Sequence, residues 1–85
     1  MIIEKFRPDK VREMYKRFEE KGRQLPEGLR FINSWINEEV TLCYQLMETE
    51  NIKKLYEWID RWKDVAEFEI VKVISSAEAK TKILG

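Results

Sequence analysis

Five side chains of types that bind small molecules alternate along two neighbouring apolar segments, residues 29–36 and 41–48. They are Asn33, Trp35, Cys43, Gln45 and Met47. Apolar and aromatic walls give a pocket its affinity, while a few amides fix the orientation of the ligand. We therefore take these five residues as a candidate binding pocket. The alternative is a plain dimer interface in which the amides hydrogen-bond across the contact, and the sequence leaves both interpretations open.

Several kinds of catalytic site are excluded by composition. The chain has no histidine, which removes His-based metal sites and the Ser-His-Asp triad. Cys43 is the only cysteine, and without a histidine nearby we interpret it as a structural residue rather than a nucleophile. The acidic residues show no metal-ligand spacing. We therefore expect no metal and no cofactor. A carboxylate could still act as a base if it were buried.

Two further groups of residues could recognise an anion. Trp58 and Trp62 with Arg61 could clamp an anionic aromatic molecule, although indoles at this helical spacing are more typical of a core. Arg23 lies in a predicted loop that also contains Gly28, where a weak anion site could form. Neither pattern is specific on its own.

Composition limits the partners. The 16 basic residues balance 16 acidic ones, so the net charge of zero gives no general attraction to nucleic acid or to acidic membranes. The segment 41–48 also lacks the basic, glycine and aromatic signature of RNA-recognition domains. No apolar run approaches the roughly 20 residues that span a bilayer. A lone cysteine is typical of a reducing compartment, so we expect a cytoplasmic protein with no nucleic-acid or membrane partner.

The order of the predicted elements indicates the fold. Apolar periodicity and stop signals such as Gly22 predict the following order. Strands are expected at 2–6, 29–36, 41–48 and 68–74, and helices at 9–21, after Asn51, and at 76–83, the last with a Ser75–Glu78 capping box. This is the α+β, ferredoxin-like βαββαβ order with a short C-terminal helix. At 85 residues we expect one such domain, residues 1–85.

The hairpin at 29–49 predicts the assembly. With residues 38–40 as its loop, Trp35 lies opposite Cys43 and Arg30 opposite Glu48, an ion pair across the strands. We expect one side to face the helices: Ile32, Ile36, Leu42, Tyr44 and Leu46. We expect the other side to be open: Leu29, Phe31, Asn33, Trp35, Cys43, Gln45 and Met47. So large an apolar patch marks an interaction surface, and a homodimer with its two sheets face to face would cover it.

Five runs of the sequence resemble one family. They are RQLPEGL (23–29), SW (34–35), CYQLMET (43–49), EWIDRW (57–62) and FEIV (68–71). Together they are similar to the DUF3303 family of unknown function, over nearly the whole chain. The resemblance implies a dimeric α/β barrel and carries no activity. Two hypotheses follow: a protein that binds, or turns over without a cofactor, a small and partly apolar molecule, or a non-catalytic dimerisation or regulatory module.

Overall fold

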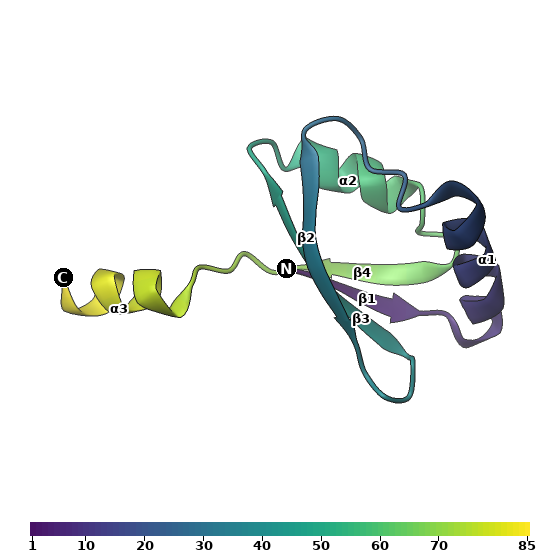
Figure 1. Cartoon of the computed structure of the whole chain (residues 1–85), viewed down its shortest axis with the longest axis horizontal. Helices are drawn as coiled ribbons and strands as arrows, with labels where there is room; N and C mark the ends of the chain where they lie inside the picture. Colours follow the sequence, from purple (N-terminus) through teal and green to yellow (C-terminus); the bar gives the residue numbers. More distant parts are fainter.

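A computed structural model describes the whole chain, residues 1–85, as an α+β protein. The elements in order are β1 (Ile2–Phe6), the 3-10 turn η1 (Pro8–Lys10), α1 (Val11–Lys21), β2 (Leu29–Ile36), β3 (Leu42–Thr49), α2 (Lys53–Asp60), β4 (Ala66–Ile70) and α3 (Ser76–Leu84). The four strands form one sheet in the order β2-β3-β1-β4, and every neighbouring pair is antiparallel. Figure 1 shows α1 and α2 beside this sheet and α3 away from it.

Most predicted elements are confirmed, and one strand differs. The fourth strand was expected at 68–74 but runs from Ala66 to Ile70. Its start pairs Ala66 with Phe6, and the last main-chain bonds to β1 join Val71 and Met1. β4 lies at the edge of the sheet and pairs with β1 alone, so residues beyond Val71 have no neighbouring strand to continue the ladder.

A β-bulge in β2 overturns the predicted register. Arg30 lies opposite Glu48 as expected, and the two form an exposed ion pair of 3.0 Å. The pairing then shifts by one residue at Ile32, so Trp35 lies opposite Tyr44 rather than Cys43. Because side chains alternate between faces along a strand, one extra residue moves everything after it to the other face.

The predicted assignment of faces was therefore wrong for most of the hairpin. Five residues expected on the open face belong to the helix side, where they are buried or half-buried: Leu29, Phe31, Cys43, Gln45 and Met47. Three residues expected under the helices lie on the open face: Leu42, Tyr44 and Leu46. Ile36 is on the helix side as predicted, and Ile32 is exposed at the bulge. Asn33 and Trp35 do lie on the open face.

The core lies between the helix side of the sheet and the two helices. Ile2 and Phe6 of β1 meet Met14 of α1 and Trp58 of α2 in one buried cluster. The ring of Trp58 also packs edge-on against Phe68 at 5.3 Å between centroids. These contacts fix the layer spacing over the middle of the sheet.

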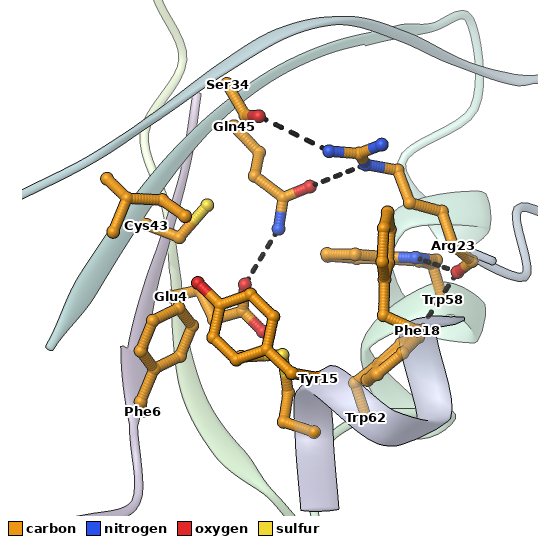
Figure 2. A pocket seen from close by; sticks show the side chains of 12 residues that line it. Glu4, Phe6, Tyr15, Phe18, Arg23, Ser34, Cys43, Gln45, Trp58 and Trp62 are labelled. Carbon is orange, nitrogen blue, oxygen red and sulfur yellow. Dashed lines mark hydrogen bonds between the residues drawn. The ribbon is translucent and has the colours of Figure 1, made fainter. Parts of the chain in front are cut away.

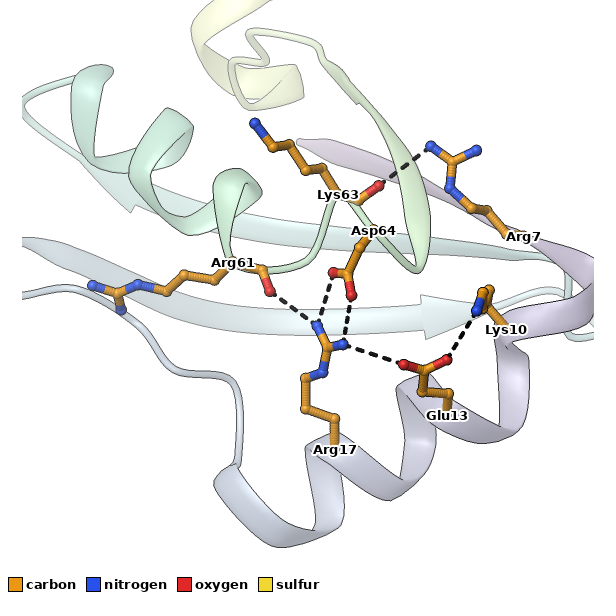
Figure 3. A network of polar contacts seen from close by, with 7 residues as sticks. All are labelled: Arg7, Lys10, Glu13, Arg17, Arg61, Lys63 and Asp64. Carbon is orange, nitrogen blue, oxygen red and sulfur yellow. Dashed lines mark hydrogen bonds and ion pairs between the residues drawn. The ribbon is translucent and has the colours of Figure 1, made fainter.

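A polar network fastens α1 to the segment between α2 and β4 (Figure 3). The Arg17 guanidinium donates two hydrogen bonds to the Asp64 carboxylate, at 2.9 and 2.6 Å, and a third to the main-chain oxygen of Arg61. The same guanidinium lies 5.5 Å from the centre of the Trp62 ring. Paired, planar contacts of this kind are the strongest form of ion pair, so the two helices are held together on this side of the core.

The C-terminal helix stands apart from the domain (Figure 1). Its predicted cap is confirmed, because Ser75 Oγ accepts a 3.0 Å hydrogen bond from the main-chain nitrogen of Glu78. No residue of α3 is buried, and its apolar Ile83 and Leu84 are largely exposed. None of the helices has the length and hydrophobicity needed to cross a membrane.

Candidate functional site

The candidate site is a partly open cavity of about 120 Å³ between the helix side of the sheet and helices α1 and α2. Figure 2 shows its lining side chains. Eight of the twelve lining residues are hydrophobic, and the polar ones gather on the sheet side and in the loop after α1. The lining residues are Glu4, Phe6, Met14, Tyr15, Phe18, Arg23, Ser34, Ile36, Cys43, Gln45, Trp58 and Trp62.

Glu4 is the ionisable group at the base of this cavity. It stands in β1 between Ile2 and Phe6, and the strand turns all three toward the core, leaving Glu4 only 4% exposed. One carboxyl oxygen accepts a 2.8 Å hydrogen bond from Gln45 Nε2. The other oxygen has no protein partner, and since no buried side-chain oxygen lacks a partner, it must be open to the cavity.

Burial sets the acidity of Glu4. Loss of water around the carboxylate raises its pKa from 4.5 to about 7, while the Gln45 hydrogen bond and the positive charge of Arg23 oppose the rise. A carboxyl with this pKa exists in both protonation states near neutral pH. It can therefore accept or donate a proton, as a general acid–base group must.

Arg23 provides the positive charge of the site. Its Nε donates to Gln45 Oε1 and its Nη2 to Ser34 Oγ, both at 3.3 Å, which is long for such bonds. The guanidinium carbon lies 3.5 Å from the centre of the Phe31 ring and 5.1 Å from that of Phe18. Arg23, Gln45 and Glu4 thus form a chain of hydrogen bonds across the cavity wall (Figure 2).

Helix α2 holds the loop that carries Arg23. The indole Nε1 atoms of Trp58 and Trp62 both donate to the main-chain oxygen of Arg23, at 2.8 and 3.0 Å. Arg61 donates to the main-chain oxygen of Gln24. Both tryptophans line the cavity but Arg61 does not, so the three do not form the clamp that the sequence suggested. They position the Arg23 backbone and form part of the cavity wall.

The cavity also contains a thiol and a phenol. Burial raises the pKa of the Cys43 thiol to about 11, with a further rise from the nearby Glu4 charge. Burial likewise raises the pKa of Tyr15. Both groups are neutral near pH 7, and a thiol with so high a pKa is a poor nucleophile. The interpretation of Cys43 as a structural residue fits this setting.

The structure brings together only part of the predicted pocket. Cys43 and Gln45 line the cavity, and Met47 packs against the core beside it. Asn33 and Trp35 lie on the opposite face of the sheet, because the bulge separates them from the other three.

Glu4 is the residue that sequence reasoning missed. Its signal was its position, since a carboxyl between Ile2 and Phe6 in an alternating strand must lie on the apolar face. The weak anion signal at Arg23 belongs to this same site. No group of three His, Cys, Asp or Glu side chains lies close enough to hold a metal ion.

Comparison with known proteins gives one match. The family model described as "Domain of unknown function (DUF3303)" covers residues 1–84. No curated protein and no solved structure matches the chain.

Proposed function

Because the chain belongs to the DUF3303 family, whose description names no function, we propose a function from the geometry: the cavity binds a small, partly apolar molecule, and Glu4 exchanges a proton with it. One observation carries the proposal. A buried carboxyl keeps one oxygen for Gln45 and turns the other, without any protein partner, to an apolar cavity. Buried polar groups usually have hydrogen-bond partners, so an oxygen that the protein leaves without one is available to a ligand in the cavity.

The size and walls of the cavity favour a ligand about as large as one ring. An apolar cavity of about 150 Å³ holds benzene, and this cavity of about 120 Å³ is partly open, so a substituent can extend outward. Aromatic side chains of α1 and α2 would contact the ring faces. Glu4 and Arg23 would fix the orientation of its polar group, as a few convergent polar residues do in ligand sites.

The chemistry that fits is proton transfer within the ligand. The protonated Glu4 carboxyl would give its proton to a carbon atom of a bound enolate, the electron pair of the C=C bond would form the new C–H bond, and the C–O⁻ group would become a carbonyl. Arg23 supplies a positive charge on the same cavity wall to stabilise the enolate oxygen. The Glu4 carboxylate would then take a proton from another carbon next to that carbonyl, which restores an enolate and the protonated carboxyl, so the step needs no other reactant.

The test uses the three tryptophans as reporters. Their indole N–H signals are followed by NMR while p-cresol, a ring with one polar group, is added. Binding in the cavity shifts the signals of Trp58 and Trp62 and leaves Trp35 unmoved, because Trp35 lies on the other face of the sheet. Unchanged Trp58 and Trp62 signals at millimolar p-cresol would contradict the proposal.

A second candidate, a dimerisation module, is favoured by the open face of the sheet. This face carries Trp35, which is 51% exposed, together with Tyr44 and the aliphatic Leu42 and Leu46. A neighbouring strip has mixed charge, with Lys5 opposite Glu67 across β1 and β4. A two-fold axis could place each charge against its opposite on a second copy. We propose a homodimer through this face.

We also propose a fold class and a cellular location for the protein. The strand order β2-β3-β1-β4 and the two helices on one face support a ferredoxin-like fold. Two such sheets facing each other would form a dimeric α/β barrel. The free, buried Cys43 supports a reducing, cytoplasmic location. The dimer and the ligand cavity use opposite faces of the sheet, so they can be tested separately.

A further inference from the structure

We infer that the ligand of this cavity is a small organic monoanion, and that its charged group binds the guanidinium of Arg23. The inference rests on the proposed function, because it names the class of molecule that the same cavity takes. Two features of the site support it: the surroundings of Arg23 and the balance of charge in the cavity.

Arg23 is a half-buried cation with no carboxylate partner. Of the five other arginines, three contact an acidic side chain, Arg7, Arg17 and Arg30, and the two without such a contact, Arg12 and Arg61, are exposed to water. The side-chain acceptors of Arg23 are instead two neutral oxygens at 3.3 Å, and its Nη1 has no acceptor. A buried charge is normally paired, because loss of water is otherwise uncompensated. An anionic ligand would supply the missing partner.

The geometry around the guanidinium favours a planar anion. The rings of Phe18 and Phe31 lie near the guanidinium, and hydrogen bonds from two indoles hold the Arg23 backbone in place. A guanidinium held in this way presents its N–H groups in a fixed plane, which suits a carboxylate or an enolate. The aromatic walls of the cavity then accept the apolar part of the same molecule.

The charge balance favours a single negative charge. Arg23 is the only cation that lines the cavity, and Glu4 is its only carboxyl. When Glu4 is protonated, one positive charge remains to meet one negative charge. A dianion such as a phosphate monoester would leave a buried charge without a partner. An ionised Glu4 would also repel the anion, so binding should depend on pH.

Four titratable groups line the cavity: Glu4 from β1, Tyr15 from α1, Arg23 from the loop and Cys43 from β3. The residues that line the cavity from β2 and from the α2 region are Ser34, Ile36, Trp58 and Trp62, and none of these side chains titrates in this range. Burial places the pKa of Glu4 at about 7 and raises those of Tyr15 and Cys43. Glu4 is therefore the one group that changes charge between pH 6 and pH 8, and the affinity for an anion should rise as pH falls across this range.

The experiment compares benzoate with benzamide, which has the same shape and no charge. Binding is measured by calorimetry at pH 6 and pH 8, with the Trp58 and Trp62 indole signals as a check on the site. We expect benzoate to bind at least tenfold more tightly than benzamide at pH 6, and several-fold more weakly at pH 8 than at pH 6. Inorganic sulfate, a dianion at both pH values, is the third probe and should bind more weakly than benzoate.

Variants separate the charge from the fold. Arg23→Gln should weaken benzoate about tenfold, the expected loss for one charge-assisted hydrogen bond, and should weaken benzamide less, so that the preference for benzoate shrinks. Arg23→Lys keeps the charge and should retain part of the preference. Arg30→Gln is the matched control, since Arg30 pairs with Glu48 on the exposed end of the hairpin, and it should change neither probe.

Each outcome has one meaning. Benzamide equal to or tighter than benzoate, with the indole signals shifted, overturns the monoanion and leaves the cavity as a binding site for neutral molecules. Tighter binding of sulfate than of benzoate also overturns it. If neither benzoate nor benzamide shifts the indole signals, the proposed function fails together with the inference.

Discussion

Gln45 donates its side-chain Nε2 to Glu4 over 2.8 Å, and this is the only hydrogen bond that the buried carboxyl receives from the protein. The protonation state of the Glu4 carboxyl in the cavity is therefore linked to the free energy of unfolding. Because the pKa of Glu4 rises from 4.5 to about 7 on folding, the folded state holds a proton that the unfolded state releases between these values.

The first prediction concerns stability and pH. A group whose pKa is raised on folding stabilises the protein fully below its unfolded pKa, and this stabilisation is lost as pH rises through the folded value. We expect Glu4 to lower the free energy of unfolding by on the order of 3 kcal/mol between about pH 4.5 and 7.5. Urea unfolding followed by tryptophan fluorescence at several pH values measures this.

Glu4→Gln isolates that contribution. The new amide carries no charge and keeps an oxygen that can accept from Gln45. The variant should therefore be more stable than wild type at pH 8 and close to it at pH 4.5. Glu19→Gln, an exposed change on α1, is the matched control and should follow the wild-type curve. If the free energy of unfolding changed with pH in the same way in Glu4→Gln and in wild type, the pKa of Glu4 in the folded protein would not be near 7.

The second prediction tests the hydrogen bond itself. Gln45→Leu removes the amide that favours the charged form of Glu4, so the pKa of Glu4 should rise further. The carbon signal of the Glu4 carboxyl, titrated by NMR, reports this directly. Asn33→Leu, a change of amide to leucine on the opposite face of the sheet, should leave the titration where it is. A lower pKa in Gln45→Leu would count against the proposed linkage.

Much of the fold could be predicted because its signals are local. The alternation in 2–6, the stop at Gly22 and the Ser75–Glu78 capping box each depend on a few adjacent residues, and the structure has all three. The ion pair of Arg30 and Glu48 was also predicted from the hairpin alone.

The faces of the sheet could not be predicted, since they depend on one inserted residue. Nothing at Ile32 marks a bulge: there is no glycine or proline, and a register without the bulge also pairs apolar residues with one another. The shift places Ser34 and Ile36 in the cavity wall and leaves Trp35 outside. Three of the five predicted pocket residues were therefore on the helix side of the sheet, and two were on the other face.

The third prediction tests the homodimer. Trp35→Asp places a charge on the open face, in a position already 51% exposed, so the chain should still fold. If two copies pack through this face, the charge would be buried in the interface and the protein should become monomeric. Size-exclusion chromatography with light scattering at micromolar concentration measures the change.

Tyr56→Asp provides the comparison for the dimer test. Tyr56 is 56% exposed on α2, so the substitution changes an equally exposed aromatic residue to the same acid on the helix side of the molecule. It should leave the dimer intact. A wild-type protein that is monomeric at these concentrations, or a dimer that survives Trp35→Asp, would remove the open face as the interface.

The fourth prediction concerns Cys43, whose thiol is 5% exposed and has a pKa of about 11 because burial disfavours the thiolate. At pH 8 only about one thiol in a thousand would be ionised, and the thiolate is the reactive form. Iodoacetamide should therefore label the folded protein very slowly and the protein in guanidinium chloride at the ordinary rate for a free cysteine.

The Cys43→Ser variant should retain the binding of p-cresol, while its buried hydroxyl lowers the free energy of unfolding by about 1–3 kcal/mol. Rapid labelling of the folded protein would instead indicate an activated thiol in the cavity, and loss of p-cresol binding in a folded Cys43→Ser variant would give the sulfur a direct part in recognition.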